Sequence, residues 1–110
     1  MLAAQRERRE IVVSDALRQY IADLVRATRN HPFLRYGASP RGALALMRAG
    51  QAVAGIRGRS YVLPDDIKAL VRPVLSHRLI LTDTERMRGE HVDNIVTQIL
   101  ETTPVPATAE

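Results

Sequence analysis

The sequence predicts a mainly α-helical domain: a small bundle of about four helices, with at most minor pairing of short β-strands. Apolar residues recur at intervals of three and four along most of the chain, which is the period of one helix face. The β-branched runs are short, so they supply only brief extended segments. With 110 residues, of which 45% are hydrophobic, the chain is long enough to bury one core.

Four segments have the periodicity and boundary residues of a helix. The first is expected at residues 14–29, with Ser14 as its cap, and the second at residues 40–56. The third begins at Pro64, and Pro73 predicts a break or kink near Arg72 followed by a short helical piece through His77. The last covers residues 92–100. The expected core residues are Leu17, Ile21, Leu24, Leu44, Met47, Val53, Ile67, Leu70, Val74, Leu75, Ile95 and Ile99.

The segments between these helices have weaker patterns. Residues 33–38 are expected to form a loop, and residues 82–89 a polar loop. Residues 79–81 are apolar and extended, and we expect them to pair with either residues 11–13 or residues 61–63.

The ends of the chain differ from its middle. Residues 1–10 are dense in charge and have no broad apolar face, which predicts a connecting arm from a domain upstream. Residues 103–110 have neither a helix nor a strand pattern, which predicts a flexible tail. The helical domain is therefore assigned to residues 11–102.

The chain is basic, with a net charge of +4 and a single lysine, Lys68. Such a balance is compatible with nucleic acid, a nucleotide or an acidic partner. The arginines are dispersed and aromatic residues make up only 4%, which does not favour nucleic-acid binding. No apolar run is long enough to span a bilayer, and cysteine is absent, so we expect a cytoplasmic protein without membrane insertion.

No catalytic constellation is evident, so the chain alone is not expected to turn over a substrate. A serine hydrolase is rejected because Arg41 replaces the second glycine of G-x-S-x-G and no sheet is predicted to expose Ser39. No phosphate-cradling G-x-x-x-x-G-K-[ST] motif is present. The three histidines lack metal-ligand spacing, and no metal site is predicted. The adjacent Asp65 and Asp66 are interpreted as favourable charges at a helix start.

The turn at residues 37–42 contains the most informative residue, Arg41. Ser39 is a good N-cap and Pro40 suits the first helical position, but Arg41 places a cation where the helix dipole favours an anion. Arg41 is either an exposed arginine of little consequence or a ligand for an anion that docks at this helix start. Spacing alone gives these interpretations about equal weight.

Several segments resemble the C-terminal lid domain of MoxR-family AAA+ ATPases. They are VVSDALRQYIADLVRATRNHP, YGASPRGALALMRAGQAVAGIRGRSYVLPDDIKALVRPVLSHRLIL and the closing TTPVP. The resemblance implies that Arg41 is the sensor-2 arginine, which reaches the γ-phosphate of ATP, and that Ser39 and Pro40 position it. His77 and Arg78 also match the family pattern; a salt bridge or a place on the subunit surface is favoured for them, and they are weaker candidates for nucleotide contact than Arg41.

This sequence departs from the family pattern at two positions. Leu63 stands where a capping Thr or Ser is usual, so Asp66 is expected to lack its reciprocal cap. Gly42 stands where Ala is more usual, which is expected to loosen the first turn of that helix.

The resemblance implies a role within a larger ATPase. ATP and Mg²⁺ would be bound mainly by an upstream AAA+ core, and no cofactor is expected on this chain alone. Subunits would form a ring, expected to be hexameric, that remodels or matures protein complexes in the manner of a chaperone, with a von Willebrand A domain protein as a possible partner. The alternatives are a basic helical module that binds DNA or RNA and a stand-alone protein-interaction module.

Overall fold

The computed structural model describes residues 11–106, which contain five α-helices, one 3₁₀-helix and a two-stranded antiparallel sheet. The predicted fold class is confirmed. In chain order the elements are α2 (Asp15–Asn30), β1 (Leu34–Tyr36), α3 (Pro40–Ile56), α4 (Pro64–Leu75), η1 (Ser76–Arg78), β2 (Ile80–Leu81), α5 (Asp83–Met87) and α6 (Val92–Thr102). The expected arm at residues 1–10 lies outside the described residues.

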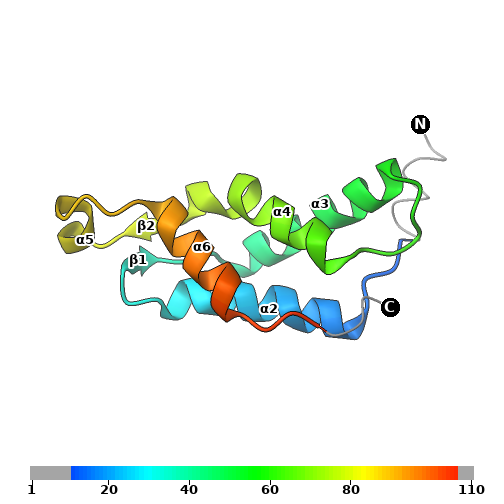
Figure 1. The fold of residues 1–110 in the computed structure, drawn as a ribbon, viewed down its shortest axis with the longest axis horizontal. Coiled ribbons are helices and arrows are strands. Elements are labelled where there is room, and N and C mark those ends of the chain that lie inside the picture. The colour runs from blue at the N-terminus through cyan, green and yellow to red at the C-terminus, as the bar shows by residue number, and fades with distance from the viewer. Residues whose placement is uncertain (1–10, 107–110) are drawn as a thin grey trace.

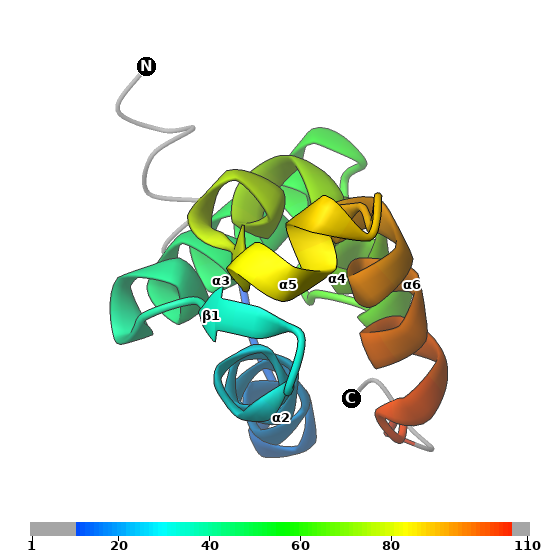
Figure 2. The same cartoon turned by 90° about the vertical axis from the view of Figure 1, so that its left-hand side faces the viewer.

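Three long helices lie side by side and α6 crosses over two of them (Figure 1). Helix α3 packs between α2 and α4, and α6 contacts both α2 and α4. The sheet lies at the left end of Figure 1, where α2 ends, α3 begins and α4 ends. This end of the molecule, seen from the left in Figure 2, brings together segments far apart in sequence.

The core forms between these helices, and two expected core residues lie outside it: Val53 is only partly buried and is not part of the core cluster, and Leu44 is exposed. Leu44 is 44% exposed, whereas Leu46, two positions later, is completely buried. The inward face of α3 consists of Gly42, Leu46, Gly50 and Ala54, spaced by four residues. Leu44 lies about 200° around the helix from Leu46, so both cannot face the core.

The glycines of this face bring α3 close to the side chains of α4. A Cβ atom on Gly50 would lie 2.8 Å from Ile67 Cδ1, which is closer than van der Waals contact permits. Leucine and alanine alternate in this segment, so the sequence does not show which face of α3 is buried. The buried face consists mainly of the smallest residues.

Helix α4 continues through Pro73 and ends at Leu75, so the helix does not break near Arg72. Proline removes one backbone donor, the one that would bond to the carbonyl of Ala69. Ala69 lies on the exposed side of α4, where water can satisfy that carbonyl. The short helical piece expected after the proline is the 3₁₀-helix η1.

We expect Pro73→Ala to raise the free energy of unfolding of the chain by about 1 kcal/mol. The substitution restores the missing helical hydrogen bond, and this gain exceeds the entropy that proline removes from the unfolded chain, about 0.4–1 kcal/mol. Urea denaturation of the two chains measures the difference. An unchanged or lower stability would show that the proline ring itself stabilises this part of α4.

The short strands pair differently from the expectation. β2 pairs with β1, with Leu34 opposite Leu81 and Tyr36 opposite Ile80, and not with residues 11–13 or 61–63. Those two segments contact each other instead, through a parallel bridge between Val12 and Tyr61. β1 lies in the segment expected to be a loop.

The segment at residues 82–89, expected to be a polar loop, contains the short helix α5. Thr82 caps this helix, because its Oγ1 accepts a hydrogen bond from the backbone N–H of Glu85 at 3.3 Å. Beyond α6, Thr103 is buried and its hydroxyl donates to the carbonyl of Ile99 at 2.7 Å. Among residues 11–106, no helix is both long enough and apolar enough to cross a membrane.

Candidate functional site

The candidate site is the start of α3. Its backbone has the arrangement that the sequence predicts, but the side chain of the N-cap residue makes no capping hydrogen bond. Ser39 occupies the N-cap position in an extended conformation, and Pro40 is the first helical residue. The carbonyl of Ser39 accepts hydrogen bonds from Gly42 N–H at 2.8 Å and Ala43 N–H at 3.3 Å. The Ser39 hydroxyl makes no capping bond, so Ser39 holds the expected N-cap position without a side-chain cap.

Arg41 is exposed in the first turn of α3, and this turn contains no acidic residue. Within residues 11–106, the ion pairs of the molecule leave the Arg41 guanidinium without an acidic partner. The positive end of the helix dipole and an unneutralised guanidinium therefore coincide at one exposed point. This arrangement disfavours any nearby cation and favours an anion from outside the described chain.

The turn before α3 is held against the end of α2. Thr28 is buried, and its Oγ1 accepts a hydrogen bond from Ala38 N–H at 2.9 Å. Gly37 approaches the α2 backbone so closely that a Cβ atom there would lie 2.6 Å from Arg29 N. Sequence reasoning missed Thr28. The available signal was a threonine at an inward position of an otherwise apolar helix stripe.

Arg78, one of the weaker candidates, lies beside the first turn of α3. A Cβ atom on Gly42 would lie 3.5 Å from Arg78 Cδ and 3.2 Å from Leu75 Cδ2. The guanidinium of Arg78 donates to the carbonyl of Val74 and lies 3.1 Å from Nε2 of His77, the other weak candidate. Gly42 is buried here, so the glycine allows close packing as well as reducing helix propensity.

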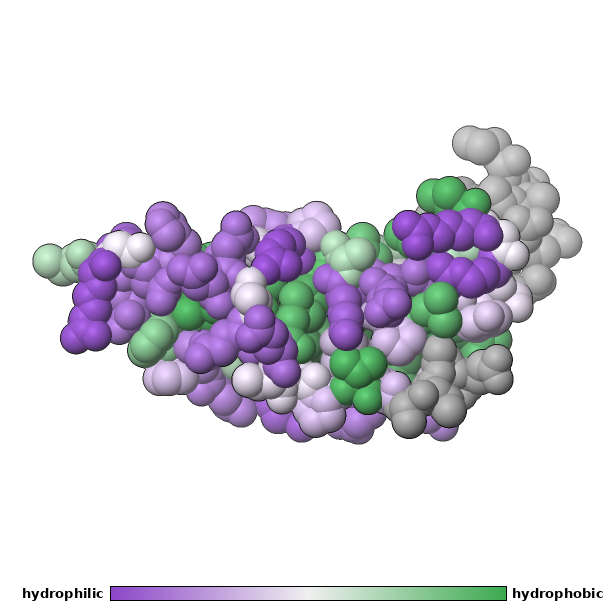
Figure 3. All heavy atoms as spheres, viewed as in Figure 1, coloured by the Kyte–Doolittle hydropathy of each residue, from purple (hydrophilic) through white to green (hydrophobic). Residues whose placement is uncertain are grey.

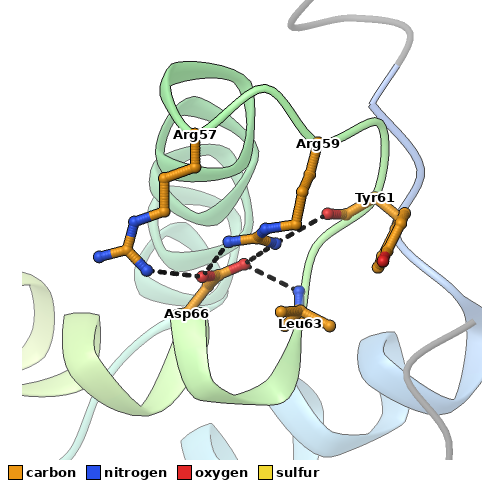
Figure 4. A network of polar contacts seen from close by, with 5 residues as sticks. All are labelled: Arg57, Arg59, Tyr61, Leu63 and Asp66. Atoms are coloured by element: carbon orange, nitrogen blue, oxygen red, sulfur yellow. Dashed lines mark hydrogen bonds and ion pairs between the residues drawn. The ribbon is translucent and has the colours of Figure 1, made fainter.

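At the other end of α3, Asp66 forms a buried ion-pair network (Figure 4). Its side chain is only 1% exposed, and Arg59 donates to both carboxylate oxygens at 2.7 Å. The N–H of Leu63 donates to Asp66 Oδ2 at 2.8 Å, so the carboxylate caps α4 even though Leu63 cannot cap in return. Arg57 lies 3.8 Å from Oδ1.

The pKa of Asp66 is set by competing effects. Burial of the carboxylate raises its pKa, but the hydrogen bonds from Arg59 and Leu63, together with the charges of Arg59 and Arg57, outweigh burial. The pKa therefore lies below its usual value. The interpretation of Asp66 as a simple helix-start charge is incomplete, because the residue joins the α3–α4 connection to the start of α4. The network stabilises the fold and lies at the opposite end of α3 from Arg41.

The histidines occupy separate places in the fold. His31 Nε2 lies 2.7 Å from Gln98 Oε1, which links the end of α2 to α6, and His91 precedes α6. Among the residues that the structure describes, no three His, Cys, Asp or Glu side chains are grouped so that they could hold a metal ion.

Comparison with known proteins identifies the family of this chain. The family model of the AAA lid domain matches residues 26–99. A solved structure of a protein from Cytophaga hutchinsonii, described as a "putative ATPase", has a TM-score of 0.88 and 33% sequence identity. That similarity covers 93% of this chain and 34% of the other.

Curated relatives give the same result. The Bacillus subtilis protein YeaC, itself named as uncharacterized, is 40% identical over 102 residues, covering 93% of this chain and 32% of YeaC. Protein MoxR of Paracoccus denitrificans is 38% identical over 108 residues, covering 86% of this chain and 32% of that protein. Chaperone MoxR1 of Mycobacterium tuberculosis is 32% identical over 103 residues, covering 86% of this chain and 27% of MoxR1.

The chain thus spans about a third of the length of these relatives. The matches confirm the resemblance inferred from the G-A-S-P-R turn and the segments around it. The chain belongs to the AAA lid domain family, and the relatives that contain the same domain include proteins named MoxR.

Proposed function

We propose that this chain is the lid of a MoxR-type AAA+ ATPase, that it closes over ATP bound by an upstream core, and that Arg41 contacts the γ-phosphate. The observation that carries the proposal is the exposed Arg41 at a helix start, without an acidic partner among residues 11–106. A guanidinium donates two parallel hydrogen bonds to phosphate oxygens, and such charge-assisted bonds are about twice as strong as neutral ones.

The residues at this site fit a triphosphate. Arg41 supplies positive charge, and the α3 start has no acidic residue that would repel a phosphate. The first turn of α3 offers no carboxylate to Mg²⁺. We therefore assign Mg²⁺ and most nucleotide contacts to the core. ATP bound there supplies the phosphoryl group that is transferred to water.

Within this proposal, the residues of this chain bind the terminal phosphate and orient the side chain that contacts it. Arg41 stabilises the negative charge on the terminal phosphate and draws the lid towards the core when that phosphate is present. Ser39 and Pro40 set the backbone direction at the start of α3 and so position Arg41. Arg78 and His77 are secondary candidates, because the Arg78 side chain lies against the same helical turn.

At the level of the whole protein, we propose a ring, hexameric by resemblance, that couples ATP hydrolysis to chaperone-like remodelling or maturation of protein complexes. One relative is named Chaperone MoxR1, which supports this part of the proposal. A von Willebrand A domain partner and a cytoplasmic location remain predictions from the sequence.

Nucleic-acid binding has less support. Among residues 11–106, two arginines pair with an aspartate of their own helix: Arg26 with Asp23 at 3.4 Å and Arg86 with Asp83 at 3.0 Å. The face in Figure 3 is largely hydrophilic, with small apolar patches between the polar side chains. The lid proposal predicts no binding to duplex DNA whose affinity falls steeply with salt, so such binding would favour this alternative.

Protection of arginines from an arginine-specific reagent tests the proposal in the full-length protein. A non-hydrolysable ATP analogue is expected to protect Arg41 from modification, and ADP to protect it less. Arg48, which is also exposed on α3, serves as the internal control and is expected to react equally in both states. Equal reactivity of Arg41 with and without the ATP analogue would contradict the proposal.

A further inference from the structure

Thr28 is a buried polar residue on the core side of α2, only 2% exposed. Its hydroxyl donates to the carbonyl of Val25 at 2.6 Å and accepts from the N–H of Ala38 at 2.9 Å. The Thr28 hydroxyl is therefore both a donor and an acceptor. The first bond fixes the hydroxyl on its own helix, and the second binds a residue ten positions later in the chain.

The residue before Ala38 strengthens this attachment. An added Cβ on Gly37 would lie 2.6 Å from each of three α2 backbone atoms, namely Arg29 N, Thr28 C and Thr28 O. A side chain at this position would clash with the backbone of α2, so only glycine fits. The backbone at Gly37 therefore packs directly against α2. Ala38, next in the chain, is completely buried. Two consecutive residues are thus held against α2 immediately before Ser39.

This attachment matters because the helix start has no side-chain cap of its own. The Ser39 hydroxyl makes no capping bond, so Ser39 does not fix where the first turn lies. Arg41 is three residues beyond Ala38, within the first turn of α3. The hydrogen bond from Ala38 to Thr28 is consequently the nearest side-chain tether that holds this turn in place.

We propose that Thr28 is a positioning residue for Arg41: its hydroxyl holds the Gly37–Ala38 segment and thereby sets the direction in which α3 presents the guanidinium. This inference rests on the proposed function of Arg41 in nucleotide contact. Thr28 touches no ligand and acts only through the backbone. Displacing a reacting group by about 1 Å can lower a rate by about 10²-fold, so a small shift at this turn is sufficient to matter.

The test compares Thr28→Val and Thr28→Ser in the full-length protein, at a temperature well below unfolding. Valine keeps the shape and loses the hydroxyl, whereas serine keeps the hydroxyl. We expect Thr28→Val to lower kcat for ATP hydrolysis by about tenfold, with a smaller change in KM, and Thr28→Ser to restore most of it. Thr102→Val is the matched control, because its hydroxyl donates only to carbonyls of its own exposed helix end.

A double-substitution cycle shows whether Thr28 acts through Arg41. In an Arg41→Ala background, Thr28→Val is expected to have no further effect on kcat. Equal losses in both backgrounds would overturn the inference, because Thr28 would then act on hydrolysis by another route. A loss of thermal stability with unchanged kcat would also overturn it, since the residue would be structural only.

Amide hydrogen exchange separates this inference from the proposed function. Thr28→Val is expected to accelerate exchange at Ala38 and in the first turn of α3, and Thr28→Ser to leave it near the original rate. Unchanged exchange in Thr28→Val would overturn the positioning role whatever Arg41 does. Normal hydrolysis by Arg41→Ala alone, with accelerated exchange in Thr28→Val, would reject the nucleotide role of Arg41 and with it the functional part of the inference.

Discussion

Replacing Arg41 by alanine in the full-length protein is expected to lower kcat for ATP hydrolysis by about 10²-fold or more, which is the scale of losing one group that stabilises transition-state charge. The stability of the fold is expected to change by less than about 0.5 kcal/mol, because the side chain is exposed. A steady-state ATPase assay and a thermal melt measure the two effects. The prediction requires a large loss of kcat without a comparable loss of stability.

Two further variants sharpen this result. Arg48→Ala removes another exposed arginine from the same helix and is expected to retain full activity. Arg41→Lys keeps the charge but loses the paired donors of the guanidinium, so activity between the original and alanine forms is expected. Equal activity of Arg41→Ala and Arg48→Ala, both folded, would contradict the role of Arg41.

Removing the buried carboxylate of Asp66 is expected to have the largest effect on folding. Asp66→Ala leaves Arg59, whose side chain is 19% exposed, without its bidentate partner. Losing hydrogen bonds to a charged group costs about 1.5–3 kcal/mol, and the partly exposed Arg59 can recover some contact with water. Urea denaturation of the chain measures the loss. Asp65→Ala, at the exposed neighbouring position, is the control and is expected to cost less than about 1 kcal/mol.

The same network predicts how stability depends on pH. The pKa of Asp66 is lower in the folded chain than in the unfolded chain, so its contribution is fully present above the unfolded value of about 3.9. The contribution is lost as the pH falls through the lower folded pKa. The stability difference between the original chain and Asp66→Asn is therefore expected to be constant near neutral pH and to shrink below about pH 4. A difference that stays constant into acid would contradict the assigned role of the charge.

Local sequence signals were sufficient for much of this fold. The long helices follow from apolar periodicity, and the second helix begins at Pro40 and ends at Ile56, as expected. A further signal was present but not used: Thr82 followed three residues later by Glu85 is the pattern of a helix start. The polar character of that segment led to its prediction as a loop.

The features that were missed depend on contacts between segments distant in sequence. Leu44 was placed in the core because several faces of α3 are apolar, and only the packing of Gly42 and Gly50 against α4 identifies the buried one. The partner of β2 is a strand of three residues, too short to show a pattern. Thr28 has a role only because the turn before α3 returns to α2.

The site itself was inferred from a local anomaly together with a resemblance. An arginine at a helix start is physically unfavourable for the isolated helix, which is why Arg41 could be selected from the sequence. The structure adds that Arg41 is exposed and that Ser39 does not cap the helix with its side chain. That the anion is a phosphate of ATP is a proposal from the resemblance, since this chain spans about a third of the length of the matched relatives.

The most direct measurement is a structure of the full-length protein bound to a non-hydrolysable ATP analogue and Mg²⁺. We expect the lid to close on the core and the Arg41 guanidinium to donate to an oxygen of the terminal phosphate at about 2.7–2.9 Å. A closed, nucleotide-bound lid in which Arg41 points to solvent, or contacts only protein, would contradict this expectation.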